Sequence, residues 1–311
     1  MKPAIVRPLV PTWQVTAAAI VLAGCLFAFV KRPLAETNEP SFHYARLHAA
    51  MGVSQARHAE PQNVIAEFEK ALALDPTYAD AANHLANFHL QQRRMPEAEA
   101  AYRRTLDLQP DHADARNNLG LLLTLSGRAE EAVKEYQHAI RSRPGFADAR
   151  SNLGYTLMSL GKLNDAESEL RLAIESGAGI NARHNLALCL MAQGRKKDAR
   201  DQYAENLKTA PDHLASLNDL AWLLATTSDD DLRNGKQALE LARKADSLSG
   251  GQHPLIHHTL AAALAETGQF EEAAIEARKG ADLATASGDA NLAATIQKQA
   301  ESYARRQPWR E

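Results

Sequence analysis

The chain has 311 residues, of which 45% are hydrophobic and only 5% are aromatic. Ala and Leu dominate, and runs of β-branched and aromatic residues between turn residues are absent after residue 45, so we expect an all-α fold. The net charge is −3, and residues 1–44 contain four basic and two acidic residues, which leaves 31 basic and 36 acidic residues in the remainder. This acidic balance, without a basic stripe, argues against DNA or RNA as a partner.

The N-terminal segment has the properties of a membrane anchor. After a basic tail at 1–12, residues 13–30 carry no charge, and as a helix they would cover about 27 Å of the hydrocarbon core of a bilayer. We therefore predict a transmembrane signal anchor at 13–30, with the N-terminus in the cytoplasm, followed by a linker at 31–44. The alternative is a lipoprotein anchored through Cys25, because the run Leu-Ala-Gly-Cys at 22–25 resembles a bacterial lipobox.

The cysteine content sets a further limit. Cys25 and Cys189 are the two cysteines of the chain, so neither a disulfide framework nor a cysteine zinc site is expected. Cys189 lies among leucines, which predicts a buried thiol.

From residue 45 onward the sequence repeats with a period of 34 residues, which indicates a solenoid of stacked units. The residues that recur at this spacing are Leu85, Leu119 and Leu153; Ala98, Ala132 and Ala166; Tyr102, Tyr136 and Leu170; and Pro110 and Pro144. We divide residues 45–288 into units at about 45–78, 79–112, 113–146, 147–179, 180–213, 214–253 and 254–287, with a capping helix and tail at 289–311. The sixth unit carries five additional residues between its helices, around 227–234.

The third unit carries the clearest family signature. It resembles a tetratricopeptide repeat (TPR) in Asn117, Asn118, Leu119, Gly120, Gly127, Ala132, Tyr136, Ala139 and Pro144. The small Gly120 should let the first helix approach the second, Tyr136 should fill the space beside it, and Pro144 should end the second helix. The resemblance implies a right-handed superhelix of about seven helix pairs closed by a capping helix.

The first helices of the pairs are expected to line a concave groove in which a partner binds. Asn118, Asn152 and Asn185 each stand immediately before the recurring leucine of the first helix of a unit. They are similar to the asparagine ladder in the TPR region of O-linked N-acetylglucosamine transferase. A carboxamide can pair with both the N–H and the C=O of a bound peptide backbone. The other candidate groove residues are Asn83, His84, Asn87, Asn117, Tyr155, Asn218 and Trp222. Two alternatives stay open: the asparagines bond neighbouring helices and stabilise the superhelix, and Trp222 belongs to the core.

The sequence has no nucleophile elbow, phosphate loop or haem-attachment motif, so we expect no catalytic site, no cofactor and no metal. His253, His257 and His258 lie close together, but no nearby cysteine or carboxylate completes a ligand set. We interpret the three histidines as a solvated helix start after Pro254.

These features predict a non-catalytic scaffold or adaptor that binds a peptide segment or a helix of another protein, in the assembly of cell-envelope complexes. The expected location is the bacterial inner membrane, crossed once, with the repeats in the periplasm. The alternatives are a homo-oligomerisation platform and an accessory subunit of a membrane glycosyltransferase.

Overall fold

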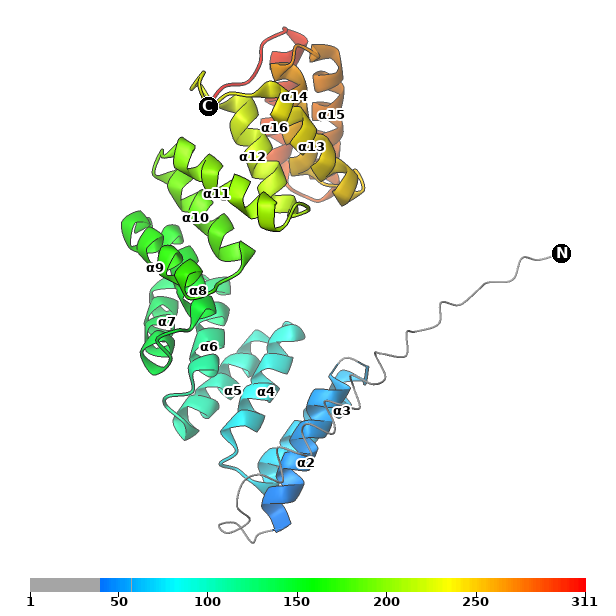
Figure 1. Cartoon of the computed structure of the whole chain (residues 1–311). Coiled ribbons are helices and arrows are strands. Elements are labelled where there is room, and N and C mark those ends of the chain that lie inside the picture. The colour runs from blue at the N-terminus through cyan, green and yellow to red at the C-terminus, as the bar shows by residue number, and fades with distance from the viewer. Residues whose placement is uncertain (1–39, 57) are drawn as a thin grey trace, which may run out of the picture. The chain divides into compact units, whose positions relative to one another are not determined.

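The computed structural model describes residues 40–56 and 58–311, so the predicted anchor at 13–30 and Cys25 lie outside the described residues. Within the described residues the chain forms fifteen α-helices and no β-strand, which confirms the all-α prediction. None of these helices combines the length and the apolar character needed to cross a bilayer. The described residues divide into two compact units, one ending at Gln92 and the other comprising Arg93–Glu311. Figure 1 labels the helices of both units.

The described part of the first unit consists of α2 (Pro40–Gln55), α3 (Pro61–Leu74) and α4 (Ala79–Gln91). Its core gathers around Phe68, which is 1% exposed and packs with apolar residues of α3 and α4. α2 and α3 approach closely at Gly52, where an added Cβ would lie 2.9 Å from the Phe68 ring. The small residue is therefore needed for this approach.

The start of α2 corrects one predicted boundary. The helix begins at Pro40, whereas the sequence predicts a linker up to residue 44. Proline is favoured at the first helical position, because its fixed φ suits a helix and its missing N–H would have no partner there. The guanidinium of Arg46 also lies 5.0 Å from the ring centroid of Phe42 and 5.9 Å from that of Tyr78, which ties this turn to the segment before α4.

The second unit is a succession of helices in which each one packs against the next. Alternate helices α6, α8 and α10 also contact one another, as do α12 and α14. The helices are α5 (Met95–Leu108), α6 (Ala113–Leu125), α7 (Ala129–Ser142), α8 (Ala147–Ser159), α9 (Leu163–Glu175), α10 (Ile180–Ala192), α11 (Lys196–Thr209), α12 (Leu214–Thr226), α13 (Gly235–Ser249), α14 (Pro254–Glu266), α15 (Phe270–Ala286) and α16 (Ala290–Ala304).

The pair α6–α7 packs as its sequence predicts. A Cβ added to Gly120 would lie 2.7 Å from Cε1 of Tyr136, closer than side chains pack. Tyr136 is 1% exposed and Ala132 is fully buried. Gly120 and Tyr136 are therefore complementary across the crossing of the two helices.

The turn between the two helices of a pair requires a left-handed residue. Gly127, after α6, has a φ of +76°, which glycine adopts at little cost because it has no Cβ. Arg93 occupies the corresponding position after α4 and has a φ of 58°. An L-residue in this region is strained by about 1–2 kcal/mol. This turn is therefore less favourable than the glycine turns.

Several pairs are also joined by an ion pair between residues 19 positions apart. Arg116 Nη1 on α6 lies 2.7 Å from Glu135 Oε2 on α7, and Arg150 Nη1 on α8 lies 2.7 Å from Glu169 Oε2 on α9. These four side chains are mostly buried against the helix surfaces, with exposed fractions between 16% and 25%. The ion pairs therefore hold the two helices of a pair at one register.

The pair α12–α13 departs from this pattern. The additional residues of the sixth unit form the loop at 227–234, and Asn234 caps α13 by accepting a 3.1 Å hydrogen bond from the N–H of Gln237. The position of Arg116 is taken by Leu217, which is 1% exposed and packs in an apolar cluster with Ala245 and Ile256. Apolar contacts therefore replace the ion pair in this part of the chain.

Candidate functional site

Asparagine side chains connect the first helices of two successive pairs. Asn152 Nδ2 on α8 donates a 3.0 Å hydrogen bond to Asn117 Oδ1 on α6, and Asn117 Nδ2 donates a 3.1 Å hydrogen bond to Asn118 Oδ1. Asn117 is 8% exposed, whereas Asn118 and Asn152 are half-buried. We call Asn117, Asn118 and Asn152 the amide row. The bond between Asn152 and Asn117 bridges two helices, which is one of the two roles that the sequence allows for the asparagines; the other is contact with a peptide.

A second connection runs parallel to the amide row. The hydroxyl oxygens of Thr124 on α6 and Thr156 on α8 lie 3.1 Å apart, and Thr124 Oγ1 lies 3.3 Å from the Tyr136 hydroxyl. Side-chain hydrogen bonds therefore fix the spacing between α6 and α8 at two levels along these helices.

Apolar side chains share the helix faces that carry the amide row. Tyr155 lies three residues after Asn152 on α8, and Leu121 and Leu125 lie three and seven residues after Asn118 on α6, so they project from the same sides of their helices. Tyr155 is 51% exposed and Leu125 is 63% exposed. The amide row is thus bordered by accessible apolar surface, a combination that suits a protein ligand better than a small ion.

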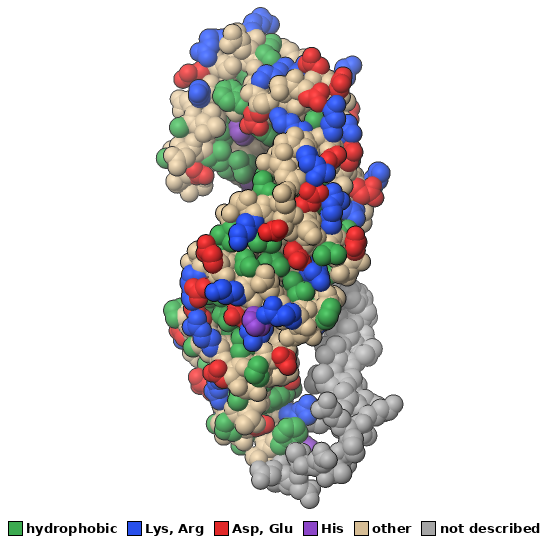
Figure 2. Space-filling model, turned by 90° about the vertical axis from the view of Figure 1, so that its left-hand side faces the viewer, with side chains coloured by type: hydrophobic (Ala, Val, Ile, Leu, Met, Phe, Trp, Pro, Cys, Tyr) green, Lys and Arg blue, Asp and Glu red, His purple; other side chains and the backbone are tan. Residues whose placement is uncertain are grey.

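Trp222 lies at the corresponding position of α12, three residues after Asp219. Its ring lies 4.3 Å from the His258 ring of α14, centroid to centroid, and its Nε1–H donates a 3.1 Å hydrogen bond to Glu311 Oε2. Trp222 is half-buried, so it takes part both in the packing of α12 against α14 and in the surface. Figure 2 shows hydrophobic side chains gathered in a hollow toward the top of that view, beside histidine.

Comparisons with known proteins agree with this geometry. Two tetratricopeptide-repeat family models match the chain, one at residues 50–111 and 89–145 and the other at 123–180. Residues 50–180 therefore consist of tetratricopeptide repeats. The matched residues include α6 to α9, and with them the amide row and Tyr155.

Solved structures show the same TPR fold at low sequence identity. The chain is similar to pilF of Pseudomonas aeruginosa, with a TM-score of 0.60 and 19% identity over 68% of this chain and 95% of that one. It is also similar to MamA, residues 41 to the end, from Desulfovibrio magneticus RS-1, with a TM-score of 0.51 and 13% identity over 57% of this chain and 99% of that one. No curated protein matches the sequence.

The predicted asparagine row changes character beyond α8. Asn185 on α10 is half-buried, and Asn218 on α12 donates a 3.0 Å hydrogen bond from Nδ2 to Asp219 Oδ1. Between them, His184 Nε2 lies 3.5 Å from Asp219 Oδ2. Burial, and then the charge of His213, lowers the pKa of His184 to about 4, and burial raises the pKa of Asp219. His184 is therefore neutral at pH 7, and its contact with Asp219 is not an ion pair between two charges.

His184 also belongs to a serine-histidine-aspartate arrangement. Ser216 Oγ lies 3.4 Å from His184 Nδ1 and 2.8 Å from His213 Nδ1, and it accepts a 3.2 Å hydrogen bond from Asn206 Nδ2. Ser216 has no exposed surface, so its hydroxyl cannot reach a substrate. We therefore assign this cluster to the packing of α10, α11 and α12.

The first unit holds the other predicted groove residues on α4. Asn83 is 7% exposed and its Oδ1 is buried without a hydrogen-bond partner among the described residues. His84 is stacked on Phe68 with ring centroids 6.1 Å apart, and Asn87 is half-buried. The ring of His84 therefore packs within its own unit.

The histidines near Pro254 are not a solvated helix start, which corrects that interpretation for two of them. His257 is fully buried, with Nδ1 2.7 Å from Glu276 Oε2 and Nε2 3.1 Å from the Gly251 carbonyl oxygen. His258 is 9% exposed and packs against Trp222, whereas His253 is exposed. The three side chains thus have different neighbours. No group of three or more potential ligands suited to a metal ion occurs in the residues that the structure describes.

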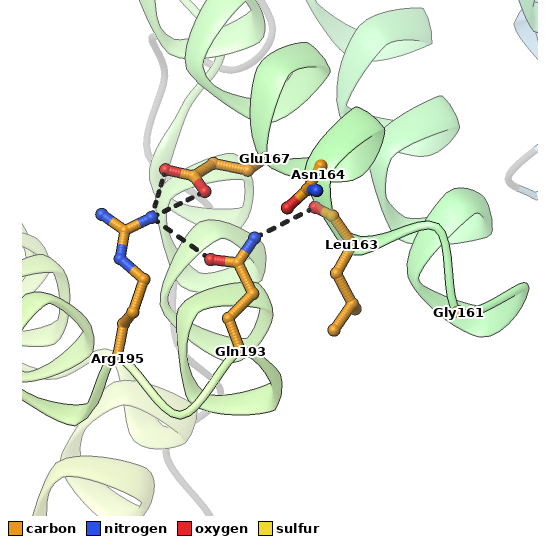
Figure 3. A pocket seen from close by; sticks show the side chains of 6 residues that line it. All are labelled: Gly161, Leu163, Asn164, Glu167, Gln193 and Arg195. Atoms are coloured by element: carbon orange, nitrogen blue, oxygen red, sulfur yellow. Dashed lines mark hydrogen bonds and ion pairs between the residues drawn. The ribbon is translucent and has the colours of Figure 1, made fainter.

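A cleft of about 480 Å³ lies at the turn edge between the fourth and fifth pairs (Figure 3). Arg195 Nη1 donates hydrogen bonds of 2.9 and 2.8 Å to the two carboxylate oxygens of Glu167, and Gln193 Nε2 donates one of 3.3 Å to the Leu163 carbonyl oxygen. Burial works against the charge of Glu167, but hydrogen bonds from Arg171, Gln193 and Arg195 lower its pKa. The side chains of Glu167, Gln193 and Arg195 are thus partnered within the cleft.

The same edge contact recurs along the unit. Arg128, after α6, lies 2.7 Å from Glu99 on α5 and 2.6 Å from Glu131 on α7, just as Arg195 bridges Glu167 and Asp198. Cys189 Sγ is buried behind the cleft, as predicted, and donates a 3.3 Å hydrogen bond to the Leu163 carbonyl. The cleft is therefore part of the joint between repeats.

Proposed function

We propose that the protein is an interaction scaffold that holds a peptide segment or a helix of a partner protein against the first helices of its repeats. Tetratricopeptide repeats are generally non-catalytic interaction modules, which supports this class of function. The observation that carries the proposal is the exposed ring of Tyr155 beside Asn152. Tyrosine is among the residues that contribute most binding energy in protein interfaces, because it buries a large rigid surface and keeps a polar tip.

The amide row suits an extended segment. Each carboxamide has two donor hydrogens and an acceptor oxygen, so Asn152 can give one hydrogen to Asn117 and keep capacity for a second partner. Amides recognise the peptide backbone in any sequence, whereas Tyr155, Leu121 and Leu125 would select apolar side chains. The face shown in Figure 2 also has intermingled positive and negative side chains and no basic stripe, which fits a protein partner rather than a nucleic acid.

We further propose that residues 13–30 anchor the scaffold in the bacterial inner membrane, with the repeats in the periplasm and a role in assembling envelope complexes. The uncharged run at 13–30 supports the anchor. A lipid on Cys25 is the alternative form of attachment.

The test is site-specific photocrosslinking in intact membranes of cells that produce the full-length protein. A photoreactive residue at Leu121 should capture a defined partner. The variant Tyr155→Ala should reduce that capture about tenfold or more, because loss of an interface anchor costs at least 1.4 kcal/mol. The thermal melt should stay unchanged, because Tyr155 is 51% exposed.

The matched control is Ile275→Ala on α15, a second helix of its pair, where Ile275 is 59% exposed. This change should leave capture at Leu121 intact. The proposal fails if Tyr155→Ala and Ile275→Ala have equal effects, or if a photoreactive residue at Ile275 captures the same partner as one at Leu121. Asn152→Ala is a less suitable variant, because it also leaves the buried Asn117 oxygen without its hydrogen bond.

A further inference from the structure

The segment after α16 turns back on the repeats. The chain reverses at Arg306, which has a φ of 60° and donates a 2.8 Å hydrogen bond from its N–H to the Tyr303 carbonyl. Gln307 and Ser302 close the turn, because the Gln307 N–H bonds the Ser302 carbonyl at 3.1 Å and Ser302 Oγ–H bonds the Gln307 carbonyl at 3.0 Å. The following residues are therefore directed across the ends of α14 and α12.

The backbone of Glu311 pairs with the end of α12 in the manner of a β-strand. Its N–H donates a 2.8 Å hydrogen bond to the Thr226 carbonyl, and its carbonyl oxygen accepts a 3.1 Å bond from the Ser228 N–H. Lys196, at the start of α11, adds a 3.2 Å bond from Nζ to the same carbonyl oxygen. Such an exchange of main-chain bonds is how proteins bind extended peptides of a foreign chain.

The side chains of this segment also find complementary groups. Glu311 Oε2 accepts the 3.1 Å hydrogen bond from the indole of Trp222, and indole has no other donor. Arg310 Nη1 lies 2.6 Å from Glu266 Oε2 at the end of α14. Arg310 thus meets an acidic residue on α14, and Glu311 meets hydrogen-bond donors on α12 and α11.

We propose that residues 308–311 are a displaceable internal ligand of the surface formed by Trp222, Thr226, Ser228 and Lys196. A partner reaches this surface with an extended segment that carries a basic residue followed by an acidic one. Trp222 corresponds in position to Tyr155, so the internal ligand occupies the end of the face to which the scaffold function is assigned. The proposal that a partner protein competes for this surface rests on the scaffold function, whereas the contact of residues 308–311 with the surface does not depend on that function.

The donors of the surface favour an acidic residue in the competitor at the position of Glu311. The surface offers three donors and one acceptor, so its ligand must supply mainly acceptors. The donors are the Trp222 Nε1–H, the Ser228 N–H and the Lys196 ammonium, and the acceptor is the Thr226 carbonyl. A short tether gives an internal ligand an effective concentration in the millimolar range. A competitor therefore needs either a high local concentration or further contacts along the amide row.

Binding of a synthetic peptide tests the proposal. The probe is the fluorescent peptide Arg-Arg-Gln-Pro-Trp-Arg-Glu, which has the sequence of residues 305–311, blocked at both ends. A shortened protein, which lacks residues 308–311, is compared with the intact protein. Fluorescence anisotropy should show that the shortened protein binds the peptide at least tenfold more tightly. The variant Glu311→Gln of the intact protein should also bind it more tightly, because the internal ligand is weakened without any loss of backbone.

Two matched substitutions in the shortened protein locate the contact. Trp222→Phe keeps an aromatic ring against His258 but removes the indole donor, and it should weaken peptide binding about fivefold. Tyr44→Phe, which removes a hydroxyl donor from a 57% exposed ring on α2, should leave binding unchanged. A peptide with Gln in place of its final Glu should bind the unsubstituted shortened protein about as weakly as the normal peptide binds Trp222→Phe.

Equal affinity of the intact and shortened proteins for the peptide would overturn the proposal. So would the absence of binding to a shortened protein that keeps the intact protein's thermal melt. If the shortened protein does not fold, Glu311→Gln decides, and an unchanged affinity rejects the internal ligand. None of these results changes the crosslinking outcome expected at Leu121, so the scaffold function stands or falls separately.

Discussion

The pairs α6–α7 and α12–α13 adopt the same arrangement with different side chains. In α6–α7 the crossing combines Gly120 with the large ring of Tyr136, whereas the corresponding residues of α12–α13 are Ala221 and Ala242, both fully buried. The ion pair of Arg116 with Glu135 likewise gives way to the apolar cluster around Leu217. The crossing of the two helices of a pair therefore accepts either a glycine against a large ring or two alanines, and the neighbouring side chains adjust to each.

The surfaces of the two regions differ as well. On α6 and α8 the amide row bridges the first helices, and the apolar residues beside it are exposed. Between α12 and α14 the bridge is the contact of Trp222 with His258, and the surface carries the segment that ends at Glu311. The regular region thus leaves apolar surface exposed beside the amide row, whereas in the C-terminal region the segment that ends at Glu311 contacts Trp222.

The largest expected difference between the two regions is the loss of stability at acidic pH. Burial lowers the pKa of both His184 and His258 to about 4, from an ordinary value near 6.5. A histidine with a depressed folded pKa stabilises the fold fully above its unfolded pKa, and this contribution is lost as the pH falls from about 6.5 toward 4. The expected loss at pH 5 is on the order of 2 kcal/mol for each histidine.

Hydrogen exchange at pH 7 and pH 5 measures this loss region by region, after correction for the intrinsic rates. Amides of α10, α12 and α14 should lose protection first, whereas α6–α9 should change little, because the histidine there with a lowered pKa, His138, is exposed. The double variant His184→Asn, His258→Asn should show a smaller pH dependence. Uniform loss of protection along the second unit would contradict the prediction.

Exchanging the small residues at the crossings tests the packing comparison. Gly120→Ala should destabilise the second unit by about 2 kcal/mol, because the new Cβ would lie 2.7 Å from the Tyr136 ring. Ala221→Gly should cost about 1 kcal/mol, since it creates little space and mainly lowers helix propensity. Urea denaturation followed by circular dichroism gives both values. A larger cost for Ala221→Gly than for Gly120→Ala would refute the proposed difference.

The smallest effect is expected at the turn after α4. Arg93→Gly should stabilise the protein by about 1 kcal/mol, because glycine adopts the φ of 58° without the strain of a Cβ, while its greater freedom in the unfolded chain offsets part of the gain. The replacement Gly127→Arg should have the opposite effect at the equivalent turn. Thermal melts of the two variants against the parent check both signs.

Much of the fold was predictable because the 34-residue period is a direct record of the packing. Gly120, Ala132 and Tyr136 have counterparts at a spacing of 34 residues in neighbouring repeats, because equivalent positions pack in equivalent places. The burial of His257 was predictable in principle from the same logic. The 19-residue spacing that joins Arg116 to Glu135 also joins His257 to Glu276, and His48 to Glu67.

The remaining features have no counterpart in the period. The bond between Asn152 and Asn117 links neighbouring positions of two helices rather than equivalent ones, so an alignment of repeats does not reveal it. The contacts of Glu311 with Trp222 and Lys196 join residues 89 and 115 positions apart, respectively. They involve a segment that belongs to no repeat, and sequence spacing carries no signal for such a contact.

The bond from Asn152 to Asn117 would link the proposed capture of a partner to the spacing between α6 and α8. A partner that accepts a hydrogen bond from Asn152 Nδ2 would compete with the Asn117 oxygen for this donor. Binding of the partner and the separation of α6 from α8 would therefore be linked thermodynamically. A change in the distance between α6 and α8 would therefore change the affinity for the partner, and a tightly bound partner would in turn change how easily these two helices separate.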